Sequence, residues 1–127
     1  MKFLHTMLRV KNIEKSLEFY TKVMRLEITS TMRLDDCTLY FLSDKDRTCE
    51  IELTYNDDTP EEGYDIGNAF GHLAFKVDSL KDFEKDLIKY GYNYLYSPFD
   101  LNGKGSIIAF VKDPDGYEIE LIESLNI

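Results

Sequence analysis

The chain has 127 residues and a formal net charge of −9. This length suits one domain of common size, and a surface of that sign repels phosphate and lacks the basic stripe that nucleic-acid binding requires. No apolar run approaches the ~18 residues of a membrane span, and the N-terminal sequence MKFLHTMLRV lacks the apolar core of a signal peptide. We therefore expect a cytoplasmic protein with no membrane or nucleic-acid partner.

The first half of the chain predicts one strand, one helix and three further strands. Residues 2–10 favour a strand, and Asn12 can then cap a helix over residues 13–24, where Ile13, Leu17 and Tyr20 share one apolar face. The three further strands are predicted over residues 26–31, 38–42 and 50–55. The segment 57–70 that follows is polar, acidic and interrupted by proline and glycine, so it is the predicted linker.

The second half predicts the same order of elements. A strand is expected over residues 72–77, followed by a helix that Ser79 and Asp82 open as a capping box and that Gly91 ends after Tyr90. Three strands are predicted over residues 92–96, 106–111 and 117–122, with turns at 102–103 and 113–116. The predicted organisation is one domain over residues 1–127, built of module 1–56, linker 57–70 and module 71–127.

The two halves also repeat one residue pattern. Ile-Glu-Leu stands at residues 51–53 and again at 119–121, and the chain's two histidines, His5 and His72, precede these tripeptides by nearly equal intervals. The alignment extends to Val10 with Val77 and to residues 38–40 with 106–108, with one residue gained in between. Ordered agreement over several elements indicates an internal duplication. The predicted fold class is α+β, with two βαβββ modules in tandem.

Each half thereby offers one imidazole and one carboxylate. Strand alternation places His5 on the face opposite Leu8 and Val10, and it places Glu52 opposite Ile51 and Leu53. Two modules with curved sheets would then enclose two histidines and two glutamates on their polar concave faces. Imidazole nitrogen and carboxylate oxygen are ligands for nickel, cobalt, zinc, manganese or iron.

Spacing alone leaves the carboxylates open, because Glu50 and Glu118 lie on the same faces as Glu52 and Glu120. We favour Glu52 and Glu120, which have apolar residues on both sides, whereas Glu118 directly follows a turn. A single strand histidine is commonly an ordinary polar residue, but two in register with carboxylates favour a metal site. Cys37 and Cys49 lack metal or redox spacing and are interpreted as small, reduced hydrophobes.

Five segments resemble the glyoxalase I family of the vicinal oxygen chelate superfamily. They are HTMLRV at 5–10, SLEFYTKVM at 16–24, IELTYN at 51–56, GH at 71–72 and AFVKDPDGYEIELIE at 109–123. The resemblance covers nearly the whole chain, and HTMLRV together with ELTYN is its most specific part. It implies that the metal ligands are His5, Glu52, His72 and Glu120, in agreement with the choice above.

The resemblance also implies a reaction. Glyoxalase I isomerises the hemithioacetal of methylglyoxal and glutathione to S-D-lactoylglutathione, by proton transfer through a metal-bound cis-enediolate. Glu120 is the implied catalytic base and Glu52 its near-symmetric counterpart. Arg9 and Asn56 match positions that bind the glutamyl end of glutathione, and Lys104 is the nearest basic residue for the glycyl end. Asn68 stands where some longer relatives carry a further arginine, which leaves open whether glutathione or another thiol is used.

Short chains of this pattern resemble the class activated by nickel or cobalt rather than zinc, since two open positions in an octahedral shell suit nickel. A homodimer is implied as well, and the linker is long enough for the modules to pair within one chain or across two. The alternatives are another protein of the same superfamily, namely an epimerase, which would carry glutamine at Glu52, or an iron dioxygenase, which needs only three protein ligands. A metal-free module that binds a small molecule is a further alternative.

Overall fold

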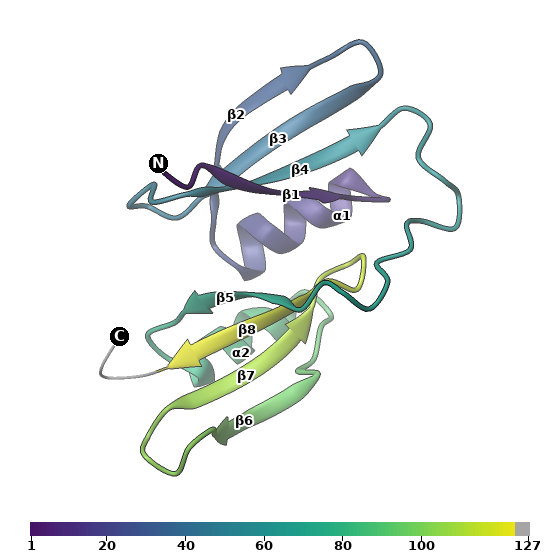
Figure 1. Cartoon of the computed structure of the whole chain (residues 1–127). Coiled ribbons are helices and arrows are strands. Elements are labelled where there is room, and N and C mark those ends of the chain that lie inside the picture. Colours follow the sequence, from purple (N-terminus) through teal and green to yellow (C-terminus); the bar gives the residue numbers. More distant parts are fainter. Residues whose placement is uncertain (124–127) are drawn as a thin grey trace. The chain divides into compact units, whose positions relative to one another are not determined.

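The computed structural model describes residues 1–123 and contains two four-stranded sheets, one in each half of the chain (Figure 1). The chain divides into two units, Met1–Asp65 and Ile66–Ile127. In each unit a helix covers one face of the sheet, because each sheet and each helix has one apolar side that must be buried. The predicted pair of βαβββ modules is therefore confirmed. Among residues 1–123, no helix is long and apolar enough to span a membrane.

In the first unit the two strands that carry the predicted ligands are neighbours. The elements are β1 (His5–Arg9), α1 (Ile13–Glu18), η1 (Phe19–Val23), β2 (Glu27–Arg33), β3 (Cys37–Ser43) and β4 (Glu50–Asn56). The sheet order is β1-β4-β3-β2, with β1 and β4 parallel. Along β1, Leu8 and Val10 are buried while His5 and Arg9 are exposed, so the expected alternation holds and the imidazole faces away from the core.

The predicted single helix over residues 13–24 is wrong in its second half. Asn12 caps α1 as expected, since its Oδ1 accepts a hydrogen bond from the Lys15 amide at 3.1 Å. From Phe19 onward the chain forms the wider π-helix η1, in which the Met24 amide bonds to the Phe19 carbonyl. The Thr21 hydroxyl donates to the Leu17 carbonyl at 2.6 Å, a contact that loosens the α-helical ladder at this point.

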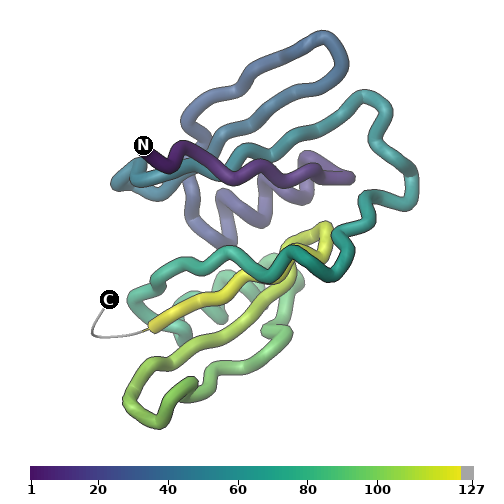
Figure 2. The backbone as a smooth tube through the Cα atoms, in the orientation of Figure 1, coloured from purple at the N-terminus to yellow at the C-terminus, as the bar shows by residue number. Residues whose placement is uncertain are grey.

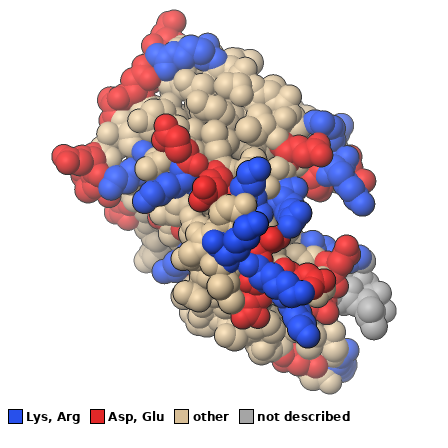
Figure 3. All heavy atoms as spheres, turned by 180° about the vertical axis from the view of Figure 1, so that it is seen from behind, with Lys and Arg blue, Asp and Glu red and all other residues tan. Residues whose placement is uncertain are grey.

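The second unit repeats the arrangement. Its elements are β5 (His72–Lys76), α2 (Leu80–Lys89), β6 (Tyr96–Asp100), β7 (Ile107–Lys112) and β8 (Glu118–Glu123), in the sheet order β5-β8-β7-β6. Ser79 caps α2 through the Asp82 amide at 3.1 Å, and Gly91 follows the helix with φ +87°. Helix α2 carries exposed charges of both signs, and blue and red side chains are interspersed on the face shown in Figure 3.

The predicted strand over residues 92–96 is wrong, because β6 begins only at Tyr96. The Tyr92 amide bonds back to the Leu87 carbonyl at the end of α2, and the Tyr94 hydroxyl donates to the carbonyl of Leu80, the first residue of that helix. Both residues are therefore bonded to the helix. Pro98 lies where the register with β7 shifts, between Tyr96 and Phe99. A proline is tolerated there because β6 is an edge strand and an irregular one.

Strand pairing corrects the alignment of the repeat. Between the paired residues Arg33 and Thr38 the first unit has four residues, whereas between Asp100 and Ile107 the second unit has six. The following hairpin compensates in part, with six residues between Ser43 and Glu50 and five between Lys112 and Glu118. Thr38 therefore corresponds to Ile107, and the predicted match of residues 38–40 with 106–108 is one residue off.

The predicted linker is packed against both units. On one side the Tyr64 hydroxyl accepts a hydrogen bond from Asn56 Nδ2 at 2.8 Å, within the first unit. On the other side the Phe70 ring meets the Tyr117 ring edge-on, with centroids 5.7 Å apart, within the second unit. Figure 2 follows the backbone through this segment from β4 to β5. The division between the units falls inside the segment, after Asp65.

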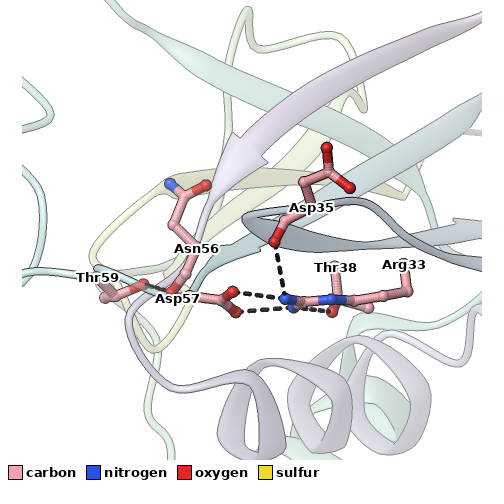
Figure 4. Close-up of polar contacts among 6 residues, drawn as sticks. All are labelled: Arg33, Asp35, Thr38, Asn56, Asp57 and Thr59. Atoms are coloured by element: carbon pink, nitrogen blue, oxygen red, sulfur yellow. Dashed lines mark hydrogen bonds and ion pairs between the residues drawn. The ribbon is translucent and has the colours of Figure 1, made fainter.

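An ion pair fixes the end of β4, where Asn56 lies (Figure 4). Arg33 donates one hydrogen bond to each carboxylate oxygen of Asp57, with Nη1 2.7 Å from Oδ1 and Nη2 2.5 Å from Oδ2. The Asp57 amide also bonds to the Asp36 carbonyl at 2.9 Å. The β2–β3 hairpin therefore holds the first residue after β4. The hydrogen bonds from Arg33 lower the pKa of Asp57 below its usual 3.8.

Replacing Asp57 by asparagine tests this contact by its dependence on pH. A lowered folded-state pKa stabilises the fold above pH 3.8, and that contribution disappears as the pH falls through the folded-state value. We expect Asp57→Asn to lower the urea midpoint slightly at pH 7, since the pair is exposed. The difference in urea midpoint between Asp57→Asn and the unmodified chain should vanish at acid pH. Asp58→Asn is the matched control, and an Asp57→Asn difference that persists unchanged below pH 3 would contradict the assignment.

Candidate metal centre

The first unit brings His5 and Glu52 together. His5 begins β1 and pairs in register with Glu50 of the parallel strand β4, while Glu52 pairs with Met7. The imidazole leans along the strand, so that its Nε2 lies 3.5 Å from Glu52 Oε1. Glu52 is only 9% exposed, whereas the histidine ring is open to solvent. A buried carboxylate therefore faces an accessible imidazole nitrogen.

The second unit brings His72 and Glu120 together in the same way. His72 pairs in register with Glu118 on β8, and its Nε2 lies 3.3 Å from Glu120 Oε2. The relation between histidine, strand register and glutamate is thus identical in the two units. The duplication recognised in the sequence reproduces the local geometry of the donor atoms.

The structure separates the carboxylates that the spacing left open. Glu50 and Glu118 lie opposite the histidines in register, yet the imidazoles contact Glu52 and Glu120. Glu50 instead accepts a hydrogen bond from the Thr29 hydroxyl on β2. Its carboxylate is therefore engaged inside its own sheet.

Each imidazole also lies against a phenylalanine that the sequence reasoning missed. The His5 and Phe41 ring centroids are 5.6 Å apart with planes at 78°, and those of His72 and Phe110 are 5.3 Å apart at 83°. Phe41 pairs with Glu52 across strands, and Phe110 pairs with Glu120. Edge-on contacts of this kind restrict the ring orientation of the histidines. The aligned phenylalanines were the available signal, but the off-by-one alignment concealed them.

One difference separates the two pairs. The Thr54 hydroxyl donates a hydrogen bond to Glu52 Oε2 at 2.9 Å, and both side chains are buried. Thr54 lies two residues after Glu52 on β4, and the residue two positions after Glu120 on β8 is Ile122. An isoleucine side chain has no donor to offer. The sequence contained this difference, but it pointed to no function until the contact was known.

The three predicted substrate-binding residues lie in different settings. Arg9 is an exposed residue at the end of β1, paired in register with Thr54. Asn56 ends β4, and its Nδ2 is bonded to the Tyr64 hydroxyl, which leaves its Oδ1 to accept from a ligand. Lys104 is exposed in the β6–β7 hairpin of the second unit, where its amide bonds to Asn102 Oδ1 at 2.9 Å.

The donor pairs have the chemistry and spacing of metal ligands. Two ligands that each lie about 2.1 Å from one ion are about 3.0–3.4 Å apart, depending on the coordination angle. The 3.3 Å separation of His72 and Glu120 falls within that range, and the 3.5 Å separation of His5 and Glu52 lies just above it. Within residues 1–123, no three histidine, cysteine or acidic side chains form a group that could hold a metal. The structure thus supplies two matched pairs, and a shared site with four ligands stays a prediction.

The sequence matches one family of known proteins and individual members of it. Residues 2–121 match the model of the Glyoxalase/Bleomycin resistance protein/Dioxygenase superfamily. A lactoylglutathione lyase of Salmonella typhimurium is 41% identical over 98% of this chain and 93% of its own length, and one of Neisseria meningitidis is 41% identical over 97% and 91%.

Solved structures agree with these relatives. Glyoxalase I of Zea mays superposes with a TM-score of 0.84 at 30% identity over 96% of this chain, which spans 44% of the maize chain. The trypanothione-dependent glyoxalase I of Leishmania major superposes with a TM-score of 0.79 at 31% identity, over 97% of this chain and 86% of its own. The chain therefore belongs to the glyoxalase/bleomycin resistance protein/dioxygenase superfamily.

Proposed function

We propose that the chain is a lactoylglutathione lyase, which isomerises the hemithioacetal of methylglyoxal and glutathione to S-D-lactoylglutathione and so removes methylglyoxal. The observation that carries the proposal is the pair of His–Glu contacts, repeated in a chain that is 41% identical to lactoylglutathione lyases over nearly its whole length. A binding module would have no need for two buried or half-buried carboxylates beside imidazoles.

The proposed metal ligands are His5, Glu52, His72 and Glu120. A bound divalent cation acts as a Lewis acid, which makes the proton beside the substrate carbonyl easier to remove. Glu120 then takes this proton and returns it to the neighbouring carbon, so one carboxylate serves as base and afterwards as acid. Glu52 is its near-symmetric counterpart in the first unit. The contact of Glu120 Oε2 with His72 Nε2 at 3.3 Å supports its place at the proposed reacting centre.

Arg9, Asn56 and Lys104 are the proposed contacts to the thiol portion of the substrate. The Arg9 guanidinium can pair with a carboxylate, and Asn56 can accept a hydrogen bond from an ammonium group through Oδ1. The bond from Asn56 Nδ2 to Tyr64 supports this orientation of the amide. Glutathione is the thiol we propose, since lactoylglutathione lyases share the most sequence with this chain in the comparisons above.

Nickel or cobalt is the proposed metal, in preference to zinc. Two imidazole nitrogens and two carboxylate oxygens leave two positions of an octahedral shell for a bidentate substrate, which suits nickel. Zinc readily adopts lower coordination numbers and would offer fewer such positions. A cytoplasmic location is part of the proposal, supported by Cys37 and Cys49, both of which are free thiols.

Metal removal and replacement tests the proposed reaction directly. Protein stripped with a chelator should have no activity with methylglyoxal and glutathione, followed by the absorbance of the thioester product. Nickel or cobalt should restore turnover and zinc should restore much less. Stripped protein without added metal, and each metal without protein, are the controls. Failure of every metal to restore product formation would overturn the lyase assignment.

Substitution of Glu120 tests the proposed base. Because general base catalysis contributes roughly 10²–10⁴-fold, Glu120→Gln should lower kcat by at least about 100-fold. Glu118→Gln is the matched control, since Glu118 lies on the same face of the same strand and the His72 imidazole nitrogen lies beside Glu120 instead. It should keep kcat within about threefold of the unmodified enzyme. Near-full turnover in Glu120→Gln would remove that residue as the base.

A homodimer is the proposed assembly. Two small modules bury limited apolar surface by themselves, and symmetric dimers are the commonest protein oligomers. Light scattering after size exclusion should therefore give a mass of twice 14.9 kDa. A mass of one chain at micromolar protein concentration would contradict the dimer.

A further inference from the structure

The duplication makes Glu52 and Glu120 equivalent in position, but the residue two places further along each strand differs. Glu52 has its two oxygens engaged separately, Oε1 by His5 Nε2 at 3.5 Å and Oε2 by the Thr54 hydroxyl at 2.9 Å. Glu120 has Oε2 beside His72 Nε2 at 3.3 Å, and Ile122 stands in the place of Thr54. Threonine and isoleucine are both β-branched, so at this position the first unit offers a hydroxyl donor and the second unit offers only hydrocarbon.

A hydrogen bond from a buried hydroxyl has two effects on a carboxylate. It fixes the rotation of the carboxylate about its last torsion, and it occupies the oxygen that accepts it, so this oxygen must break a bond before it can take a proton. Glu52 is 9% exposed and Thr54 is 6% exposed, so water does not compete effectively with this bond. Glu120 lacks such a restraint on its second oxygen at the equivalent place.

We propose that Thr54 is a positioning residue that holds Glu52 as a fixed ligand and thereby assigns the proton transfer to Glu120. This inference rests on the proposed lyase function, and it explains how a duplicated site selects one of two equivalent carboxylates. The selection follows from the donor on β4 and its absence on β8. A carboxylate that moves a proton must change its contacts during the reaction, and Glu120 is the one that can do so without breaking a hydroxyl hydrogen bond.

The contact is tested first by metal retention, which does not require turnover. Thr54→Val removes the donor and keeps the β-branched shape, while Thr54→Ser keeps the donor. With nickel alone, in competition with a chromogenic chelator, Thr54→Val should raise the nickel Kd about 10-fold, as expected for loss of a residue that orients a ligand. Thr54→Ser and the control Ile122→Val should stay within about twofold. An unchanged Kd in folded Thr54→Val would overturn the positioning role.

The division of roles is tested by moving the donor from one unit to the other. Ile122→Thr places a hydroxyl beside Glu120 and should lower kcat about 10-fold, with KM within about threefold. In the Glu120→Gln background, Thr54→Val should raise kcat about 10-fold above Glu120→Gln alone, because Glu52 is released to act as a base. The division of roles is refuted if Ile122→Thr keeps full kcat or the double variant shows no gain. An unmodified enzyme without lyase activity would refute the proposed function instead, while the nickel competition would still test Thr54.

Discussion

The parallel pairing of a short first strand with the last strand of each module is the constraint on which the candidate centre depends. Because β1 lies beside β4 and β5 beside β8, a residue at the start of the module comes next to a residue about 47 positions later in the chain. The register, His5 with Glu50 and His72 with Glu118, sets which carboxylate the imidazole can reach. A shift by one residue would turn the glutamates to the helix side of the sheet, where charges are costly.

Because of this arrangement, the residues that pack against the helix and the residues of the candidate centre lie on opposite faces of each sheet. The buried face of each sheet carries leucine, isoleucine and valine against the helix, and the opposite face carries the polar donors with phenylalanine beside them. Stability and chemistry are therefore encoded at alternate positions of the same strands. One consequence is that the two copies can diverge on the polar face, as Thr54 and Ile122 have done, while Leu53 and Leu121 on the other face are fully buried in both.

Much of this could be predicted from the sequence. The alternation in β1, the caps at Asn12 and Ser79, and the two βαβββ modules follow from local patterns that the structure confirms. The π-helix at Phe19 could not be predicted, because the choice between α and π depends on how adjacent aromatic residues pack in the core. The start of β6 was missed for a similar reason, since tertiary contacts of Tyr94 and Leu95 decide where pairing begins.

For the candidate centre, spacing identified the histidines but could not separate Glu52 from Glu50 without an argument from apolar neighbours. The structure adds the directions of the side chains, which depend on χ angles that no sequence pattern specifies. The hydroxyl contact from Thr54 and the ring contacts from Phe41 and Phe110 belong to the same class of information. The ring contacts join strands that are separated by one other strand, and the hydroxyl contact spans two residues of one strand, so they become visible only once register is known.

The segment between the modules is tied down close to both of its ends. The Tyr64 hydroxyl is bonded within the first unit and the Phe70 ring contacts Tyr117 within the second, so only five residues separate the two contacts. Within it Gly67 has φ +71°, a backbone conformation that other residues adopt with strain. The direction of the chain between these two contacts is therefore set by a few backbone torsions, one of which is best suited to glycine.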